Sequence, residues 1–330
     1  MTLLAPTLQA FFTQRLITQR NSSPNTIAGY RDTFRLLLGF AQQQTNKAPS
    51  ELDFNDIDAP LIGAFLNHLE IERHNSIRTR NVRLAAIRSL FKFAAVNHPE
   101  HAGVIARVLA IGQKRFDRAI VEFLTEAEVD ALFCAPDRST WTGRRDHTLL
   151  VVMTQTGLRV SEMTALRNKD VHLGAGAHVK VVNGKGRKQR ATPLTPTTVA
   201  TMEVWMAERQ GNRDDAVFPS RQSRWLSRDS VEHLVKKHSA FAGRQCPSLL
   251  SKRVSPHVLR HTSAMRLLQA GVDTTVIALW LGHESVETTQ IYVHADMTIK
   301  ERALARTKPP DVKAGRYQAP DALLAFLDGL

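Results

Sequence analysis

The chain has 330 residues, 43% of them hydrophobic, which predicts two domains that each bury a core. Lysine and arginine number 44 against 31 acidic residues, a formal charge of +13, and this balance favours nucleic acid as a partner over an anionic membrane surface. No apolar run approaches the roughly 18 residues of a membrane-spanning helix, and the start lacks a basic leader. We therefore expect no membrane partner and a cytoplasmic location, with Cys134 and Cys246 as reduced thiols.

The first hundred residues are predicted to form helices joined by short polar segments. Capping signals at Ser23, Asp58 and Ser76 are each followed by apolar residues at helical spacing. Basic residues occupy another side of the third helix, and no acidic residue occurs from Arg73 to Lys92. That side predicts a DNA-contacting surface, with a solvated face as the alternative. Its predicted DNA-binding residues are Arg78, Arg80, Arg83, Arg88 and Lys92.

A basic, weakly periodic stretch divides the chain. It predicts a linker in which Lys114 and Arg115 contact DNA. The predicted parts are a helical DNA-binding domain at 1–111, the linker at 112–122, a second domain at 123–307, and a tail with an apolar helix at 308–330.

The second domain is predicted to be mainly helical with a small antiparallel sheet. It begins at a capping box formed by Thr125 and Glu128. Alternating residues over 179–194 predict a β-hairpin with a basic tip. Helices are predicted at 145–156, 195–206, 227–241, 255–269, 273–281 and 286–293.

Two arginines next to helix boundaries have the chemistry to bind a phosphodiester. Arg159 follows the helix stop at Gly157, and Arg260 lies near the start of a helix capped by Ser255. A guanidinium binds phosphate oxygens through paired donors and stabilises the charge that builds on them during in-line attack. The alternatives are a surface salt bridge from Arg159 to Glu162 and a solvated helix face for Arg260. We expect Glu162 to orient Arg159.

Two histidines and a lysine are candidates for proton transfer. His257, in the first helical turn, is placed for proton transfer or phosphate contact, whereas His261 is expected to be a hydrogen-bonded core residue. A zinc site on this pair is disfavoured, because no glutamate follows His257 and Arg260 would lie beside the metal. Lys185, at the hairpin tip, is suited to protonate a leaving 5′ oxygen, with an ordinary loop cation as the alternative.

Tyr292 is the candidate nucleophile. Of the three tyrosines, Tyr30 lies on the apolar stripe of a helix and Tyr317 in a basic tail, while Tyr292 lies nine residues after His283. Attack by a phenol on a phosphodiester forms a phosphotyrosyl bond that keeps the energy of the broken ester available for rejoining.

The segments around these residues resemble those of the tyrosine recombinases, the lambda-integrase family, and most closely in pattern the Xer-type and mobile-element recombinases. The resemblance covers nearly the whole chain and is more specific in the C-terminal half. It implies two phosphate-binding arginines, a hairpin lysine that assists the leaving oxygen, an acid/base histidine, a residue at the His-or-Trp position and a tyrosine nucleophile. These are Arg159 and Arg260, Lys185, His257, His283 and Tyr292, respectively.

The resemblance also implies an architecture and a reaction. A SAM-like helical N-terminal domain and a catalytic domain would form a C-shaped clamp on double-stranded DNA at inverted-repeat sites, with Arg187 and Lys188 among the contacts. Four copies would assemble, with the apolar tail docked on a neighbour. Recombination would pass through a 3′-phosphotyrosyl link and a Holliday junction, without cofactor or metal, at the bacterial nucleoid.

Three other functions compete with this interpretation. A type IB topoisomerase uses a similar tyrosine-centred cluster, and a DNA-binding regulator with a relict site would share the basic charge. A metal-dependent nuclease is disfavoured, because the sequence shows no carboxylate cluster to hold the ions.

Overall fold

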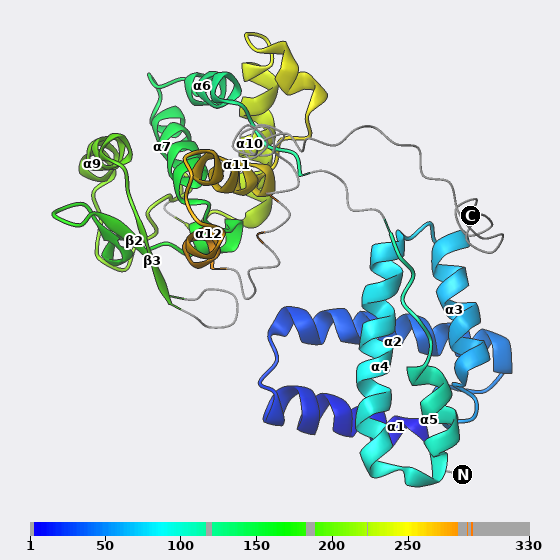
Figure 1. Cartoon of the computed structure of the whole chain (residues 1–330). Helices are drawn as coiled ribbons and strands as arrows, with labels where there is room; N and C mark the ends of the chain where they lie inside the picture. The colour runs from blue at the N-terminus through cyan, green and yellow to red at the C-terminus, as the bar shows by residue number, and fades with distance from the viewer. Residues whose placement is uncertain are drawn as a thin grey trace, which may run out of the picture. The chain divides into compact units, whose positions relative to one another are not determined.

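The computed structural model describes residues 3–116, 121–182, 189–222, 224–282, 289 and 292. The chain divides into two compact units, Met1–Arg118 and Ala119–Leu330 (Figure 1). Each unit is described by itself below. The predicted helix at 286–293 lies largely outside the described residues, and the predicted tail at 308–330 lies wholly outside them.

The first unit is helical. The side chains of Ser23, Asp58 and Ser76 each accept a hydrogen bond from a backbone N–H three residues ahead, and they start the three long helices as predicted. An additional helical segment precedes them, and its second part has π-type hydrogen bonding. The elements are α1 (Leu4–Ala10), η1 (Phe11–Gln19), α2 (Pro24–Thr45), α3 (Ala59–Ile71), α4 (Ile77–Asn97), η2 (Pro99–His101) and α5 (Ala102–Leu109).

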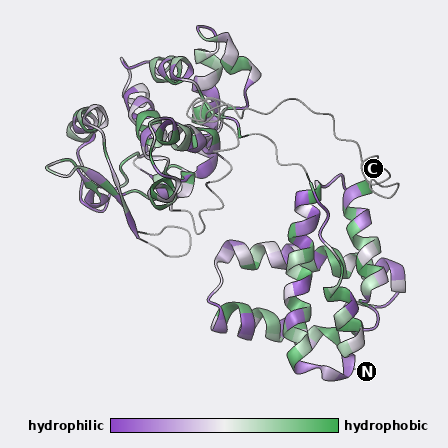
Figure 2. Cartoon of the chain, in the orientation of Figure 1, coloured by the Kyte–Doolittle hydropathy of each residue, from purple (hydrophilic) through white to green (hydrophobic). Residues whose placement is uncertain are grey.

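Apolar side chains from all of these α-helices meet in one core. Phe11, Leu66 and Phe91 are at most 1% exposed, and aromatic rings such as those of Phe11 and Phe34 meet edge to face. Hydrophobic residues share the helices with hydrophilic ones, as the colouring in Figure 2 shows. The core fixes α4 against its neighbours and so decides which of its basic residues reach the surface.

Arg80 is a correction to the predicted DNA-binding surface. It is 6% exposed, and its Nε lies 3.0 Å from Oε1 of Glu70 on α3. Lys114 Nζ lies 2.9 Å from the same carboxylate oxygen, and the Asn81 side-chain amide donates to the Lys114 carbonyl at 2.8 Å. The expectation that Arg80 faces DNA is therefore wrong, because an acid from the neighbouring helix pairs with it inside the unit.

The second unit is mainly helical and, within the described residues, contains one three-stranded antiparallel sheet in the order β1-β2-β3. β2 pairs with β3 so that Val181 faces Arg190. The helices are α6 (Glu126–Cys134), α7 (Trp141–Thr156), α8 (Val160–Thr164), η3 (Asn168–Asp170), α9 (Pro196–Arg209), α10 (Arg228–Ala242), η5 (Pro247–Ser251), α11 (Pro256–Gln269) and α12 (Thr274–Leu281). The strands are β1 (Val171–His172), β2 (His178–Val181) and β3 (Arg190–Pro193).

The helices and the hairpin predicted within the described residues are present, and their ends agree to within three residues except at the start of α7, whereas α8, β1, η3 and η5 were not predicted. The Thr125 and Glu128 capping box is formed, and Ser255 caps α11. α7, in contrast, begins at Trp141 rather than at residue 145, because the Thr140 hydroxyl accepts a hydrogen bond from the Gly143 N–H. In the described parts of the chain, no helix is long and apolar enough to cross a membrane.

Gly157 ends α7 at the point where three elements meet. It has a left-handed φ of 63°, and a Cβ added there would lie 2.6 Å from Leu281 Cδ2 and 3.0 Å from Ser263 Oγ. Glycine is therefore required both by the backbone conformation and by the close approach of α11 and α12. This junction sets the positions of Arg159 and Glu162, which follow α7 in the chain.

We expect Gly157→Ala to lower the free energy of unfolding of the second unit by about 2 to 4 kcal/mol, because it adds backbone strain and overpacking. Gly176→Ala is the matched control, since Gly176 has a φ of 72° but nothing within 4 Å of the added Cβ. It should cost only about 1 kcal/mol. All 4 tryptophans lie in this unit, so urea unfolding followed by tryptophan fluorescence measures both. Equal losses would contradict the packing argument.

Candidate active site

Arg159 and Glu162 stand together at the start of α8. The Arg159 backbone N–H donates to Glu162 Oε2 at 2.9 Å, and its Nη1 donates to Oε1 at 3.0 Å. The Glu162 side chain is 3% exposed, whereas that of Arg159 is 25% exposed. The predicted salt bridge is thus present, but its acidic half is buried inside the protein. Glu162 holds the guanidinium from behind and leaves part of it accessible.

Arg190, the first residue of β3, is the second partner of Glu162. Its Nη1 and Nη2 donate to Oε1 and Oε2 at 2.9 and 2.7 Å, a two-pronged contact. Burial alone would raise the pKa of the Glu162 carboxyl, but the hydrogen bonds and charges of Arg190, and then of Arg159, bring that pKa below its ordinary value. Glu162 is therefore an anion at neutral pH.

Arg260 is buried on α11. It donates from Nη1 to the Gly157 carbonyl at 2.6 Å and from Nη2 to the Leu281 carbonyl at 2.8 Å, and it is 4% exposed. Burial, and then repulsion by Arg159, lower the pKa of Arg260 to about 10. The guanidinium is still charged at neutral pH. An anion that reached it would relieve this unfavourable environment.

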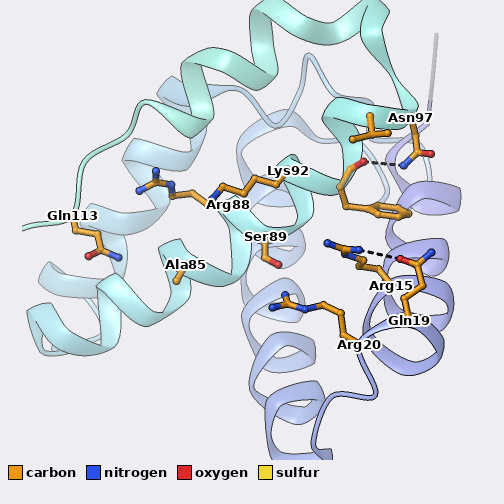
Figure 3. A pocket seen from close by; sticks show the side chains of 11 residues that line it. Arg15, Gln19, Arg20, Ala85, Arg88, Ser89, Lys92, Asn97 and Gln113 are labelled. Atoms are coloured by element: carbon orange, nitrogen blue, oxygen red, sulfur yellow. Dashed lines mark hydrogen bonds between the residues drawn. The ribbon is translucent and has the colours of Figure 1, made fainter. Parts of the chain in front are cut away.

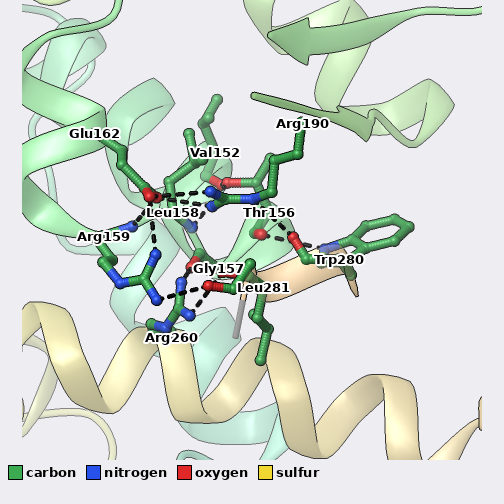
Figure 4. Close-up of polar contacts among 11 residues, drawn as sticks. Val152, Thr156, Gly157, Leu158, Arg159, Glu162, Arg190, Arg260, Trp280 and Leu281 are labelled. Carbon is green, nitrogen blue, oxygen red and sulfur yellow. Dashed lines mark hydrogen bonds and ion pairs between the residues drawn. The ribbon is translucent and has the colours of Figure 1, made fainter. Parts of the chain in front are cut away.

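Three successive backbone carbonyls at the end of α12 each accept a hydrogen bond from a different arginine. Arg190 Nε donates to the Trp280 carbonyl at 3.0 Å, Arg260 to that of Leu281, and Arg159 Nη2 to that of Gly282 at 2.9 Å (Figure 4). Carbonyls at a helix end lack intrahelical partners and carry partial negative charge, so cations there are stabilising. One helix end thus fixes three guanidinium groups from α8, β3 and α11.

Tyr292 is buried and contacts His261. The ring is 1% exposed in an apolar cluster with Met265 and Leu281, and its Oη lies 2.9 Å from His261 Nδ1. Burial raises the pKa of Tyr292 to about 12, against a lowering influence of the charges of Arg260 and Arg159. His261 was expected to be a hydrogen-bonded core residue. It is hydrogen-bonded, but its partner is the candidate nucleophile.

His257 lies on the exposed side of α11. Its ring packs edge-on against that of His261, with centroids 4.1 Å apart. It lines a hollow together with Arg159 and Arg260, and Arg228 at the start of α10 also borders this hollow. The two histidines therefore take different positions: His261 contacts the tyrosine oxygen, and His257 faces the hollow of the two arginines.

The remaining predicted residues of the site lie outside the described residues. These are Lys185, Arg187, Lys188 and His283. In the described part of the chain, no group of three histidine, cysteine, aspartate or glutamate residues could hold a metal ion.

Arg190 is the member of the site that sequence reasoning missed. In the sequence it is one more cation after a basic loop, and no local signal separates it from its neighbours. Only the pairing of β3 with β2 and the approach of α12 place it against Glu162.

Basic residues of the first unit line a separate hollow. Arg88 and Lys92 on α4 line it together with Arg15 and Arg20 from the N-terminal helical segment (Figure 3). The sequence predicted the two α4 residues but not the other two arginines.

Two further predicted contacts differ in exposure. Arg78 is exposed, whereas Arg83 is half-buried and donates to Thr33 Oγ1 at 3.2 Å.

Two family models match the chain. The phage integrase family matches residues 122–298, and the SAM-like N-terminal domain of phage integrases matches residues 10–98. The integrase/recombinase y4rC of Sinorhizobium fredii is 55% identical over 99% of this chain and 98% of its own length. The tyrosine recombinase XerD of Pseudomonas putida is 31% identical over 86% of this chain and 91% of its own.

Solved structures share the fold. The post-cleavage complex of the XerH site-specific recombinase with a palindromic difH substrate has a TM-score of 0.67 at 23% identity, over 87% of this chain and 81% of that one. The Tn1549 transposon integrase in complex with circular intermediate DNA has a TM-score of 0.69 at 16% identity, over 91% and 99%. These likenesses extend over the two units rather than one.

The chain belongs to the phage integrase family. Within that family it is a tyrosine recombinase, an enzyme of site-specific DNA recombination, as the predicted motifs indicated.

The raised pKa of Tyr292 predicts a late titration. Subtracting the near-ultraviolet absorbance of Tyr292→Phe from that of wild type isolates the signal of Tyr292. This difference should show no tyrosinate as the pH passes about 10, the pKa of a free tyrosine. The pKa of Tyr292 is higher in the folded than in the unfolded protein. The contribution of its neutral phenol to the stability of the fold is therefore fully present below about pH 10 and is lost as the pH rises toward about 12. Tyrosinate formation centred near pH 10 would contradict the burial argument.

Proposed function

We propose that the enzyme recombines DNA by two transesterifications at Tyr292. The phenol oxygen attacks the scissile phosphate, forming a 3′-phosphotyrosyl bond and releasing a 5′ hydroxyl. The 5′ hydroxyl of a partner strand then attacks this bond and releases the tyrosine. A second round on the other strands resolves a Holliday junction. The observation that carries the proposal is the convergence of the Tyr292 hydroxyl, two arginines and two histidines in one unit.

Each side chain has a distinct part in this reaction. Arg159 and Arg260 bind the non-bridging oxygens and stabilise the charge of the pentacoordinate phosphorus in the transition state. His261 accepts the proton of Tyr292, to whose oxygen it is hydrogen-bonded. His257 faces the phosphate side and transfers protons there. By resemblance, Lys185 protonates the leaving 5′ oxygen and His283 takes the position held by histidine or tryptophan.

DNA binding uses basic residues of both units. The hollow formed by Arg15, Arg20, Arg88 and Lys92 supplies four cations to the phosphate backbone. Arg78 is exposed on the same helix, α4, and Arg115, Arg187 and Lys188 are proposed to extend the contact. Arg80 is excluded because it is buried against Glu70, and the Lys114 ammonium is shared with the same carboxylate.

The wider setting is also proposed. Four copies assemble on synapsed double-stranded DNA with inverted-repeat sites, in the bacterial cytoplasm at the nucleoid. The residues at 308–330 dock on a neighbouring subunit. The match to relatives named as integrases and tyrosine recombinases over most of the chain favours strand exchange over topoisomerase-like relaxation or a purely regulatory role. Movement of a mobile element is the proposed biological role, because the Sinorhizobium fredii relative y4rC is named integrase/recombinase.

The covalent step predicts a trapped adduct. A target duplex nicked beside the cleavage position loses the short released strand, so wild-type protein should accumulate as a detergent-stable complex with DNA in EDTA. Tyr292→Phe should form none, and Tyr30→Phe, altered in the core of the first unit, should form the complex as wild type does. Adduct formation by the Tyr292→Phe variant would sink the assignment of the nucleophile.

The basic hollow predicts a difference in salt dependence. Arg88→Met should reduce the slope of log affinity against log salt by about one, because one phosphate contact and its released counterion are lost. Arg80→Met should leave that slope unchanged and lower the stability of the first unit, since Arg80 is paired with Glu70. Affinity measured over a salt series tests both variants. If Arg80→Met changed the slope as much as Arg88→Met, the assignment of the surface would be wrong.

A further inference from the structure

Arg190 is fully engaged inside the protein. Its Nη1 and Nη2 donate to Glu162, and its Nε donates to the Trp280 carbonyl, so that all three guanidinium nitrogens are bound. The side chain is 11% exposed, and it does not line the hollow that Arg159, Arg260 and His257 border. Arg260 is also buried and also donates to two carbonyls, but it borders the hollow, so absence from that hollow is what distinguishes Arg190 from the arginines proposed to bind phosphate.

The charges at the site explain why a third arginine is useful. Glu162 holds Arg159 in place, but its negative charge also offsets the positive charge that Arg159 offers to a phosphate. In a buried setting this attraction is strong, because the local dielectric response is weak. Arg190 binds both oxygens of the same carboxylate and returns the balance of the cluster to net positive. Arg159 is then oriented by Glu162 without being neutralised by it.

Arg190 also connects segments that carry other reacting groups. It lies five residues after Lys185, on the return strand of the same hairpin. Its contact with Trp280 fixes the end of α12, from which the chain continues toward His283 and Tyr292. A Cβ added at Gly282, which has a φ of 66°, would lie 2.8 Å from Arg190 Nη1, so the guanidinium packs directly on the backbone there.

We propose that Arg190 is a positioning residue of the recombinase site. It compensates the charge of Glu162, holds Arg159 ready for the scissile phosphate through that carboxylate, and fixes the end of α12. The inference rests on the proposed function of the site. A purely structural ion pair is the competing explanation, and the two differ in whether the effect depends on the charge of the phosphate.

The test measures the rate of adduct formation in a single turnover on the nicked substrate. Arg190→Met should slow cleavage by about 10 to 100-fold, as expected for loss of a group that orients a contacting residue. Lys252→Met is the matched control, because Lys252 also pairs with a buried acid, Glu128, at 2.6 Å in the same unit. It should stay within about 3-fold of wild type at a comparable loss of stability.

Two further measurements identify the role. The first uses a substrate whose scissile phosphate carries a methyl group in place of one non-bridging oxygen and so lacks its negative charge. On this substrate the slowing of cleavage by Arg190→Met should shrink to about 3-fold or less, since less negative charge needs stabilisation in the transition state. The double variant Glu162→Gln, Arg190→Met should be at least about 5-fold faster than Arg190→Met alone, because the uncompensated carboxylate is gone. If Arg190→Met does not fold, Arg190→Lys, which keeps the charge but not the two-pronged contact, takes its place with an expected loss of about 3 to 10-fold.

The outcomes separate the inference from the proposed function. Wild-type protein that forms no adduct would overturn the proposed function. Wild-type activity combined with an Arg190→Met defect no larger than that of Lys252→Met, or equal on both substrates and unrelieved in the double variant, would overturn the positioning role alone.

Discussion

The structure of the second unit depends on the hydrogen bonds made at the end of α12. A helix end exposes carbonyls without partners, and here three arginines from three other elements take them in order. Arg159 and Arg190 are further tied together through Glu162. Because a guanidinium has five donors, it can satisfy these internal acceptors and still present N–H groups outward. The contacts that pack the unit therefore also bring together the arginines proposed to bind phosphate.

Much of the fold could be predicted because the residues next to each helix boundary determine where that helix begins or ends. The caps at Ser23, Asp58 and Ser255 precede apolar residues at helical spacing, and each of them starts a helix in the structure. The early start of α7 was missed, since Trp141 is followed by no apolar residue at helical spacing before Leu149. Within the predicted helical first hundred residues, no separate helix was singled out at Leu4–Gln19, because this segment shows no recognisable cap.

The site divides along the same line between local and tertiary information. Arg159 and Arg260 could be singled out because each follows a helix boundary, and Glu162 because it lies one turn after Arg159. The pairing of Arg190 with Glu162 joins positions 28 apart and depends on the sheet. Burial of Arg80 likewise depends on Glu70 from another helix. Charge patterns along one helix cannot show which charges are already neutralised by its neighbours.

The seclusion of Tyr292 has a chemical consequence for an enzyme that breaks DNA. Its hydroxyl is protonated at neutral pH, hydrogen-bonded to a histidine and shielded by apolar side chains. In this resting form it is a poor nucleophile. In the proposed mechanism, a phosphate bound by Arg159 and Arg260 is the electrophile that the phenol lacks in the free protein. On this proposal, binding of the DNA phosphate is what makes Tyr292 reactive, and in the free protein the buried, protonated phenol reacts poorly with other electrophiles.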